Sequence, residues 1–172
     1  PENKKWLEDN GYIQNNRVIL SDRFNAILSG TTRNGNSLVS PIHSIHEDGC
    51  IPKWQLPRLD WMTFDDYHKR SDITKAMIDL GHEFAARFTI KYEMVYSVHL
   101  EEALKEDYVV LAGYAWLAPV NGEYPNPPGG SFNHVFLGFE LPRTYIFDNY
   151  YDTDGDFIKK LAKDYTLYEV GY

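Results

Sequence analysis

The hydrophobic pattern of the chain changes its period near residue 90, and this change leaves few fold classes open. Before that point, apolar residues recur three and four positions apart, most clearly in residues 73–88, which predicts helices. After it, short alternating apolar runs bounded by turns, such as 134–141 and 144–150, predict strands. Helices followed by strands indicate an α+β fold.

Local signals place the individual elements. Ser21 and Asp72 are each expected to cap a helix, because short polar side chains accept hydrogen bonds from the first backbone N–H groups. We expect helices at residues 2–9, 21–30, 37–49, 73–88 and 99–107, and a small surface helix or turn at 156–165. We expect strands at residues 92–98, 108–117, 134–141, 144–150 and 166–172. Residues 51–71 are predicted to be ordered but irregular, and the Pro- and Gly-rich residues 121–131 to form a loop.

Length and composition favour one globular domain over residues 1–172. The chain is long enough for a full hydrophobic core and shows no internal repeat or linker. Its net charge is −8 and no basic stripe is present, which argues against a nucleic-acid-binding surface, so we expect no nucleic-acid partner. The single cysteine, Cys50, excludes an intramolecular disulfide, so we expect a reducing cytoplasm or a virion rather than disulfide-forming secretion. No apolar run reaches the ~18 residues that a membrane span needs.

A histidine and two candidate partners stand at the ends of two neighbouring predicted strands. His134 opens the run 134–141, while Asp148 and Asn149 end the run 144–150. In an antiparallel pair the start of one strand faces the end of its neighbour, so these side chains can be adjacent. An imidazole fixed by such a partner can activate a thiol nucleophile and later protonate a leaving amine. The simpler alternative is a surface histidine that bonds a nearby hairpin carboxylate.

Metal and cofactor sites are not predicted. His43 and His46 are three residues apart with Glu47 adjacent, but these are too few ligands for a closed zinc site. The acidic stretch 152–156 lacks the rest of a calcium loop. Cys50 is followed by residues that do not propagate a helix, so we expect a buried, inert cysteine rather than a nucleophile.

Five stretches, in order along nearly the whole chain, match one pattern. They are LSDRFNAILSG, RNGNSLVSPIHSIHEDGCIPKWQLP, VHLEEALKEDYVVLAGYAW, NPPGGSFNHVFLGFE and TYIFDNYYD. Through them the chain resembles the papain-like cysteine peptidases, and more closely their divergent bacteriophage-encoded members. The resemblance implies a papain-like fold with N-terminal helices, a C-terminal antiparallel sheet and part of the central helix missing.

The resemblance also implies catalytic roles. His134 would be the catalytic histidine. Asp148 would orient it as in the phage proteins, or Asn149 as in papain-type endings. Neighbouring strand residues face opposite ways, so only one of the two can meet His134. We favour Asp148, because a carboxylate also stabilises the imidazolium.

Substrate-binding residues are implied in two places. The loop formed by Asn34, Gly35 and Asn36 matches the family's loop beside an extended substrate, where a glycine permits close backbone approach. A plain Asn-Gly turn is the simpler interpretation of the same residues. Asn133 precedes the histidine in the matching Asn-His pair and is the second implied substrate contact.

The chain departs from the family where the nucleophile should stand. The family places a Gln and the nucleophilic Cys at the start of the central helix, upstream of everything in this sequence, and Cys50 falls where the family has an apolar residue. The first residues, PENKKWLEDN, neither begin with Met nor resemble a signal peptide, so we expect a processed or shortened chain. We therefore expect the C-terminal portion of a thiol peptidase or amidase, a hydrolase of peptide or protein substrates. An N-terminal segment of the same precursor, or another subunit, would complete it.

Two other functions stay open on the sequence. A catalytically inactive descendant could keep the fold as a structural or binding module associated with a virion. A small-ligand binder that uses a tyrosine-rich groove has no positive motif. The residues upstream of Pro1 discriminate: a Gln followed closely by a Cys-led helix favours the enzyme.

Overall fold

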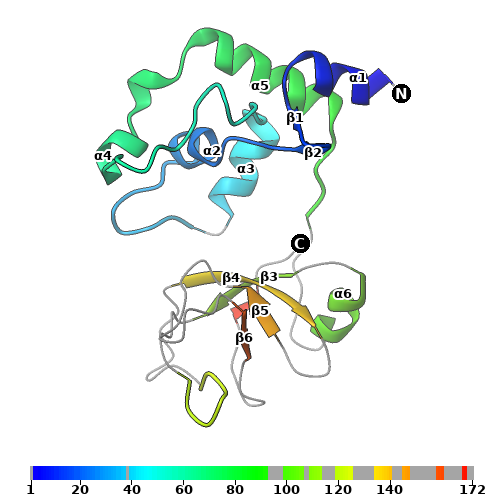
Figure 1. The fold of residues 1–172 in the computed structure, drawn as a ribbon, viewed down its shortest axis with the longest axis vertical. Helices are drawn as coiled ribbons and strands as arrows, with labels where there is room; N and C mark the ends of the chain where they lie inside the picture. The colour runs from blue at the N-terminus through cyan, green and yellow to red at the C-terminus, as the bar shows by residue number, and fades with distance from the viewer. Residues whose placement is uncertain are drawn as a thin grey trace. The chain divides into compact units, whose positions relative to one another are not determined.

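The computed structural model describes residues 2–37, 39–92, 99–106, 109–113, 119–125, 134–140, 145–147, 158–160 and 168–169. The chain divides into two compact units, Pro1–Ile90 and Lys91–Tyr172. Helices dominate the first unit and the second contains a five-stranded sheet (Figure 1). The predicted α+β class is thereby confirmed, while the single domain over residues 1–172 stays a prediction.

The first unit consists of helices and one short hairpin. Its elements are α1 (Glu2–Asp9), β1 (Ile13–Gln14), β2 (Arg17–Val18), α2 (Asp22–Leu28), α3 (Ser40–Glu47), α4 (Phe64–Tyr67), the 3-10 helix η1 (Arg70–Asp72) and α5 (Lys75–Arg87). The hairpin turns at Asn15 and Asn16, both with positive φ, which Asn tolerates better than most residues. The predicted cap of α2 is confirmed, since the Ser21 Oγ accepts a 3.1 Å hydrogen bond from the Phe24 N–H.

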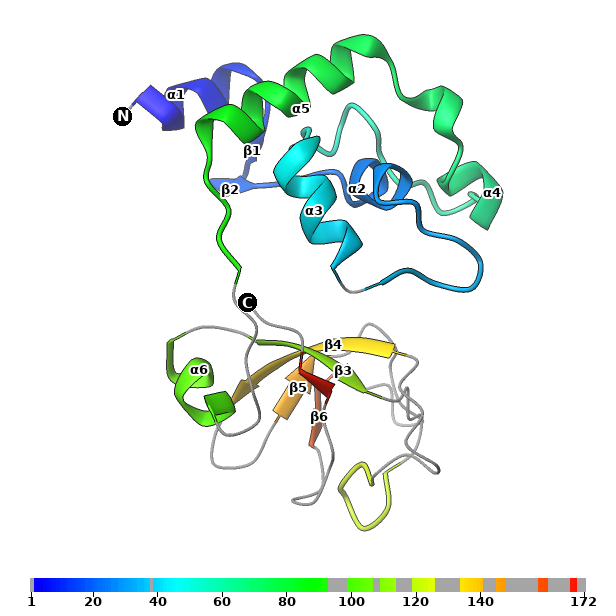
Figure 2. The same ribbon diagram turned by 180° about the vertical axis from the view of Figure 1, so that it is seen from behind.

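Two apolar clusters hold these helices together. One contains Phe24, Ile27, Ile51 and Leu56, and partly buried residues of α5 pack against it. The other contains Tyr12, Cys50 and Phe84, with Trp6 of α1 and Phe88 packed against it. Figure 2 shows α1 lying by the C-terminal end of α5, where the Arg87 guanidinium sits 5.0 Å from the Trp6 ring.

The end of α3 touches α5 backbone to backbone. Gly49 follows the C-cap of α3 with φ +71, and a Cβ built on it would lie 1.8 Å from the Gly81 carbonyl oxygen. A Cβ built on Gly81 would lie 2.3 Å from the Asp48 carbonyl oxygen. Glycine at both positions is therefore what lets the two helices approach this closely.

Two predicted helix starts are wrong. The helix α3 begins at Ser40, whereas the sequence predicted a start at Ser37. The expected cap Asp72 belongs instead to η1, and the Thr74 hydroxyl caps α5 by accepting a 3.3 Å hydrogen bond from the Met77 N–H. The reason is a competing partner, because the Asp72 carboxylate binds the buried Arg23 guanidinium.

The second unit is an antiparallel sheet with one described helix. Its elements are α6 (Leu100–Glu106), β3 (Val109–Gly113), β4 (His134–Glu140), β5 (Tyr145–Phe147), β6 (Ile158–Lys160) and β7 (Tyr168–Glu169), in the sheet order β6-β5-β4-β3-β7. The helix α6 contacts β3 and β4. The predicted β4–β5 hairpin is confirmed, with Leu137 opposite Phe147 and a register shift between Gly138 and Glu140.

The sheet has one covered and one open side where β4, β5 and β6 run together. Gly138, Ile146 and Lys159 are buried, and the last two are cross-strand partners. Their strand neighbours Leu137, Phe147 and Ile158 are exposed by 39%, 46% and 49%. Alternation along a strand produces this division, because successive side chains point to opposite faces.

The strand β6 corrects the prediction of a surface helix or turn at 156–165. A lysine pair following Ile158 suggests solvent, yet Lys159 is only 2% exposed. Its Nζ lies 5.4 Å from the centre of the Tyr124 ring, and the Tyr124 N–H donates to the Lys160 carbonyl oxygen at 2.8 Å. Pairing with β5 and cover by Tyr124 therefore override the local pattern. The predicted strand at 92–98, apart from Tyr92, lies outside the described residues.

Candidate functional site

His134 is the first residue of β4. Its Cα partner is Gly113, the last residue of β3, and on its other side β4 pairs with β5. The predicted placement of the histidine at a strand start is therefore confirmed. Of His134 the structure describes the backbone, so the imidazole contact stays a prediction.

The three other residues predicted in this unit lie outside the described residues. They are Asn133, Asp148 and Asn149. The described strands end or begin directly beside them. The strand β5 ends at Phe147, the residue before Asp148, and β4 begins at His134, the residue after Asn133. His134 is three residues before Leu137, the partner of Phe147.

The loop with Asn34 and Gly35 is closed by its own backbone. Thr32 and Gly35 exchange two hydrogen bonds, with the Gly35 N–H donating at 2.9 Å and the Thr32 N–H at 3.1 Å. The Asn34 N–H donates to the Thr32 Oγ1 at 3.2 Å, and Gly35 has φ +94. The Gly35 N–H and carbonyl are thus engaged within the turn, so pairing with an extended peptide at Gly35 would require the turn to open.

The Asn36 side chain ties this loop to the end of α2. Its Nδ2 lies 3.1 Å from the Ser29 carbonyl oxygen, 3.0 Å from the Ser29 Oγ and 3.0 Å from the Thr31 Oγ1. Its Oδ1 accepts from the Ser37 N–H at 2.8 Å. The amide is therefore used internally, and its role toward a substrate stays a prediction.

Cys50 has the surroundings of a structural cysteine. It is 5% exposed and packs in the cluster with Tyr12 and Phe84. The Tyr12 hydroxyl donates a 2.7 Å hydrogen bond to the Cys50 carbonyl oxygen. Burial raises the pKa of the Cys50 thiol to about 11, so the nucleophilic thiolate is scarce at neutral pH. The expectation of a buried cysteine is confirmed.

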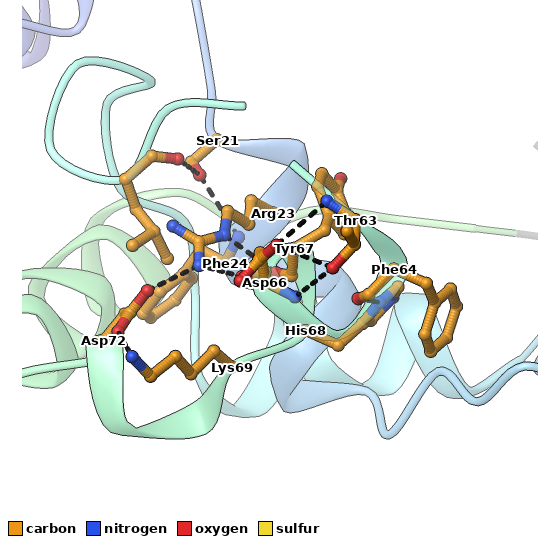
Figure 3. A network of polar contacts seen from close by, with 11 residues as sticks. Ser21, Arg23, Phe24, Thr63, Phe64, Asp66, Tyr67, His68, Lys69 and Asp72 are labelled. Atoms are coloured by element: carbon orange, nitrogen blue, oxygen red, sulfur yellow. Dashed lines mark hydrogen bonds and ion pairs between the residues drawn. The ribbon is translucent and has the colours of Figure 1, made fainter. Parts of the chain in front are cut away.

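A buried arginine organises a polar centre that the sequence analysis missed (Figure 3). Arg23 of α2 is 3% exposed, and its Nε donates to the Tyr67 carbonyl oxygen at 2.7 Å. Its Nη2 donates to the Asp66 carbonyl oxygen and, at 2.6 Å, to the Asp72 Oδ2. The guanidinium therefore joins α2 to the end of α4 and to η1. No local signal reveals it, because an arginine beside an apolar helix face usually points to water.

The short helix α4 is fixed at its N-terminus by a capping box. The Thr63 hydroxyl and the Asp66 carboxylate exchange hydrogen bonds with each other's backbone N–H groups. The Thr63 hydroxyl also donates to the Asp66 Oδ2 at 2.6 Å, and this bond, followed by that from the Thr63 N–H, holds the pKa of the Asp66 carboxyl below its ordinary value. The Thr-x-x-Asp spacing was a readable signal, close to the Ser/Thr-x-x-Glu form.

Aromatic rings continue the polar centre toward the surface. The His68 ring stacks on the Phe64 ring, with their centroids 3.9 Å apart. The Arg33 Cζ lies 4.9 Å from the centroid of the same Phe64 ring. The His68 Nδ1 is 2.9 Å from the Phe64 carbonyl oxygen, so Nδ1 carries the proton. This contact ties the end of α4 to its first residue.

Metal ligands do not gather in the part of the chain that the structure describes. No group of three His, Cys, Asp or Glu side chains there could hold a metal ion. Within the same ranges, no helix combines the length and apolar character needed to cross a bilayer.

Comparison of the chain with protein-family models, curated proteins and solved structures gives no match.

Proposed function

We propose that this chain carries the histidine half of a papain-like thiol peptidase or amidase site. The nucleophilic cysteine would come from a segment outside this sequence, either of the same precursor or of another subunit, and the substrate would be a peptide or protein. One observation carries the proposal: β4 begins at His134 and runs antiparallel to β5, whose last residue precedes Asp148. The five matching stretches of sequence support the same family and order.

The proposed chemistry assigns one proton carrier and one orienting group. The His134 imidazole takes the proton of the attacking thiol and later donates it to the leaving amine. Asp148 or Asn149 fixes the ring and its tautomer. If the register Leu137–Phe147 continues past β5, Asp148 comes opposite Phe136 and shares the strand face of His134. Asn149 would then belong to the opposite face, which supports Asp148 as the orienting residue.

A second function is favoured by one specific observation. Cys50 is the single cysteine of the sequence, and it is buried with a raised pKa. The chain by itself therefore lacks a reactive thiol. The lack of a reactive thiol is what a catalytically inactive papain-like module would show, with a structural or binding role in association with a virion.

The first test uses this chain together with the upstream, cysteine-bearing segment that the proposal requires. A Gln followed within a few residues by a Cys-led helix is expected there. Hydrolysis of a fluorogenic peptide library should fall at least ~100-fold on His134→Ala, because general acid–base groups contribute about that much or more. His82→Ala, a change at an exposed histidine of α5, is the matched control and should leave the rate unchanged.

Two results separate the proposals. An upstream sequence without any cysteine, or an extended protein that His134→Ala leaves fully active, contradicts the enzyme proposal. Loss of activity on Cys50→Ala, with the folded state intact by circular dichroism, would place the nucleophile within this chain instead.

A further inference from the structure

Asn-Gly pairs occur three times in the sequence, at Asn10, Asn34 and Asn121. Asparagine is a thermolabile residue. It deamidates when the backbone nitrogen of the next residue attacks the side-chain carbonyl carbon. A following glycine offers no Cβ to obstruct that attack. What remains to distinguish the three pairs is whether the glycine N–H is free to react.

Two of the pairs are protected by hydrogen bonds. The Gly11 N–H donates to the Glu8 carbonyl oxygen at 3.1 Å, and the Asn10 Nδ2 donates to the Trp6 carbonyl oxygen at 2.9 Å. The Gly35 N–H donates to the Thr32 carbonyl oxygen at 2.9 Å. Attack by either nitrogen first requires that its hydrogen bond be broken.

The third pair sits at the tip of a two-residue turn. Val120 and Glu123 close the turn with reciprocal backbone hydrogen bonds of 2.8 Å and 3.1 Å. Asn121 and Gly122 between them have φ values of 53° and 77°, and both are exposed. Among the described residues, nothing accepts from the Gly122 N–H, and a Cβ placed on Gly122 would meet no atom within 4 Å.

We propose that Asn121 is a site of spontaneous deamidation and isoaspartate formation. The Gly122 nitrogen forms a bond to the Asn121 Cγ, the Cγ–Nδ2 bond breaks, and the amide leaves as ammonia, with the Gly122 proton lost to solvent. Water then opens the cyclic imide at either carbonyl. The products carry aspartate or isoaspartate at position 121, and no oxidant or enzyme takes part.

The modification falls beside contacts that hold β6. Glu123 pairs with Lys160 at 2.7 Å, and Tyr124 covers Lys159. A new carboxylate at 121 adds a like charge two residues from Glu123. Isoaspartate also inserts one more carbon into the main chain of a turn that has room for two residues. Both changes act against the closed turn.

The test is deamidation of the purified full chain at mildly alkaline pH, followed by peptide mapping with mass spectrometry. An isoaspartyl methyltransferase labels the isoaspartate product independently. In the folded chain, Asn121 should react at least about ten-fold faster than Asn10 and Asn34, because the hydrogen bonds of the Gly11 and Gly35 N–H groups must break before those nitrogens can attack. In denaturant the three rates should converge, since each asparagine precedes glycine. Asn121→Gln should remove the product from its peptide and leave the other two sites unchanged.

Equal rates at Asn121 and Asn34 in the folded chain would overturn the proposal. So would a three-site ranking that persists in denaturant, because the difference would then come from sequence and not from the turn.

Discussion

The Nη2 of Arg23 lies 2.6 Å from the Oδ2 of Asp72, and 49 residues separate the two along the chain. Lys69 approaches the other oxygen of the same carboxylate at 3.8 Å. Arg23 is almost wholly buried, whereas the Asp72 side chain is 34% exposed. The arginine is thus the partner that has lost its water, and its replacement is the sharper test of the contact.

Arg23→Met should lower the free energy of unfolding by ~3 kcal/mol, because two carbonyl groups and a carboxylate lose their donor in a largely buried position. Urea unfolding followed by circular dichroism measures the change. Arg33→Met is the matched control: its ion pair with Asp65 is exposed on both sides, and its loss should change stability by less than ~1 kcal/mol. Equal effects of the two substitutions would contradict the structural role of Arg23.

Gly49→Ala should destabilise the chain far more than Gly30→Ala. Both glycines follow a helix C-cap with nearly the same positive φ, +71 and +76, so the backbone strain of ~1–2 kcal/mol is common to both. Only Gly49 would place its Cβ against the Gly81 carbonyl, whereas Gly30 faces open space. We expect the difference in unfolding free energy to exceed ~2 kcal/mol. Similar values for the two variants would show that α3 and α5 do not meet at Gly49.

Cys50 should react slowly at pH 7 with an uncharged reagent that labels thiols. The reaction should become faster as the pH approaches about 11, where the buried thiol ionises. The raised pKa also gives a stability prediction. The folded chain holds the proton more tightly than the unfolded one, so this contribution is complete at neutral pH and is lost as the pH rises toward 11. Rapid stoichiometric labelling of the folded chain at pH 7 would contradict burial, with labelling in denaturant as the positive control.

Crystallography of the extended, active protein should place an imidazole nitrogen of His134 within ~3.2 Å of an Asp148 carboxylate oxygen or, as second choice, of the Asn149 side chain. Its other nitrogen should face an open cleft. In the extended, active protein, Asp148→Ala should reduce activity less than His134→Ala, because orienting is secondary to proton transfer. A His134 ring enclosed in the core would rule out the catalytic role and leave the fold proposal standing.

Elements with strong local signals were predictable from the sequence. The Ser21 cap of α2 depends on residues a few positions apart, and the structure confirms it. The β4–β5 hairpin was also predictable, because alternation on both sides of a short turn specifies an antiparallel pair.

Elements decided by distant partners were not predictable. Asp72 and Thr74 both have cap-forming side chains, and the choice between them depends on Arg23, far away in sequence. Lys159 has the local character of a surface residue, and its pairing with Ile146 and cover by Tyr124 come from residues distant in sequence. For the site, sequence reasoning placed His134 at a strand start, and its side-chain partner stays a prediction.

The pairing of β5 with β6 restricts how this chain can change its length during evolution. Tyr145, Ile146 and Phe147 face Lys160, Lys159 and Ile158 in an unbroken ladder. Sliding β6 by one residue would bring Ile158 or Lys160 into the buried position of Lys159 and shift Glu123 away from Lys160. Insertions and deletions are therefore expected between residues 149 and 158, and not within 158–160. Among homologous chains, the segment between residues 149 and 158 should vary in length, while Ile158, Lys159 and Lys160 keep their register with β5.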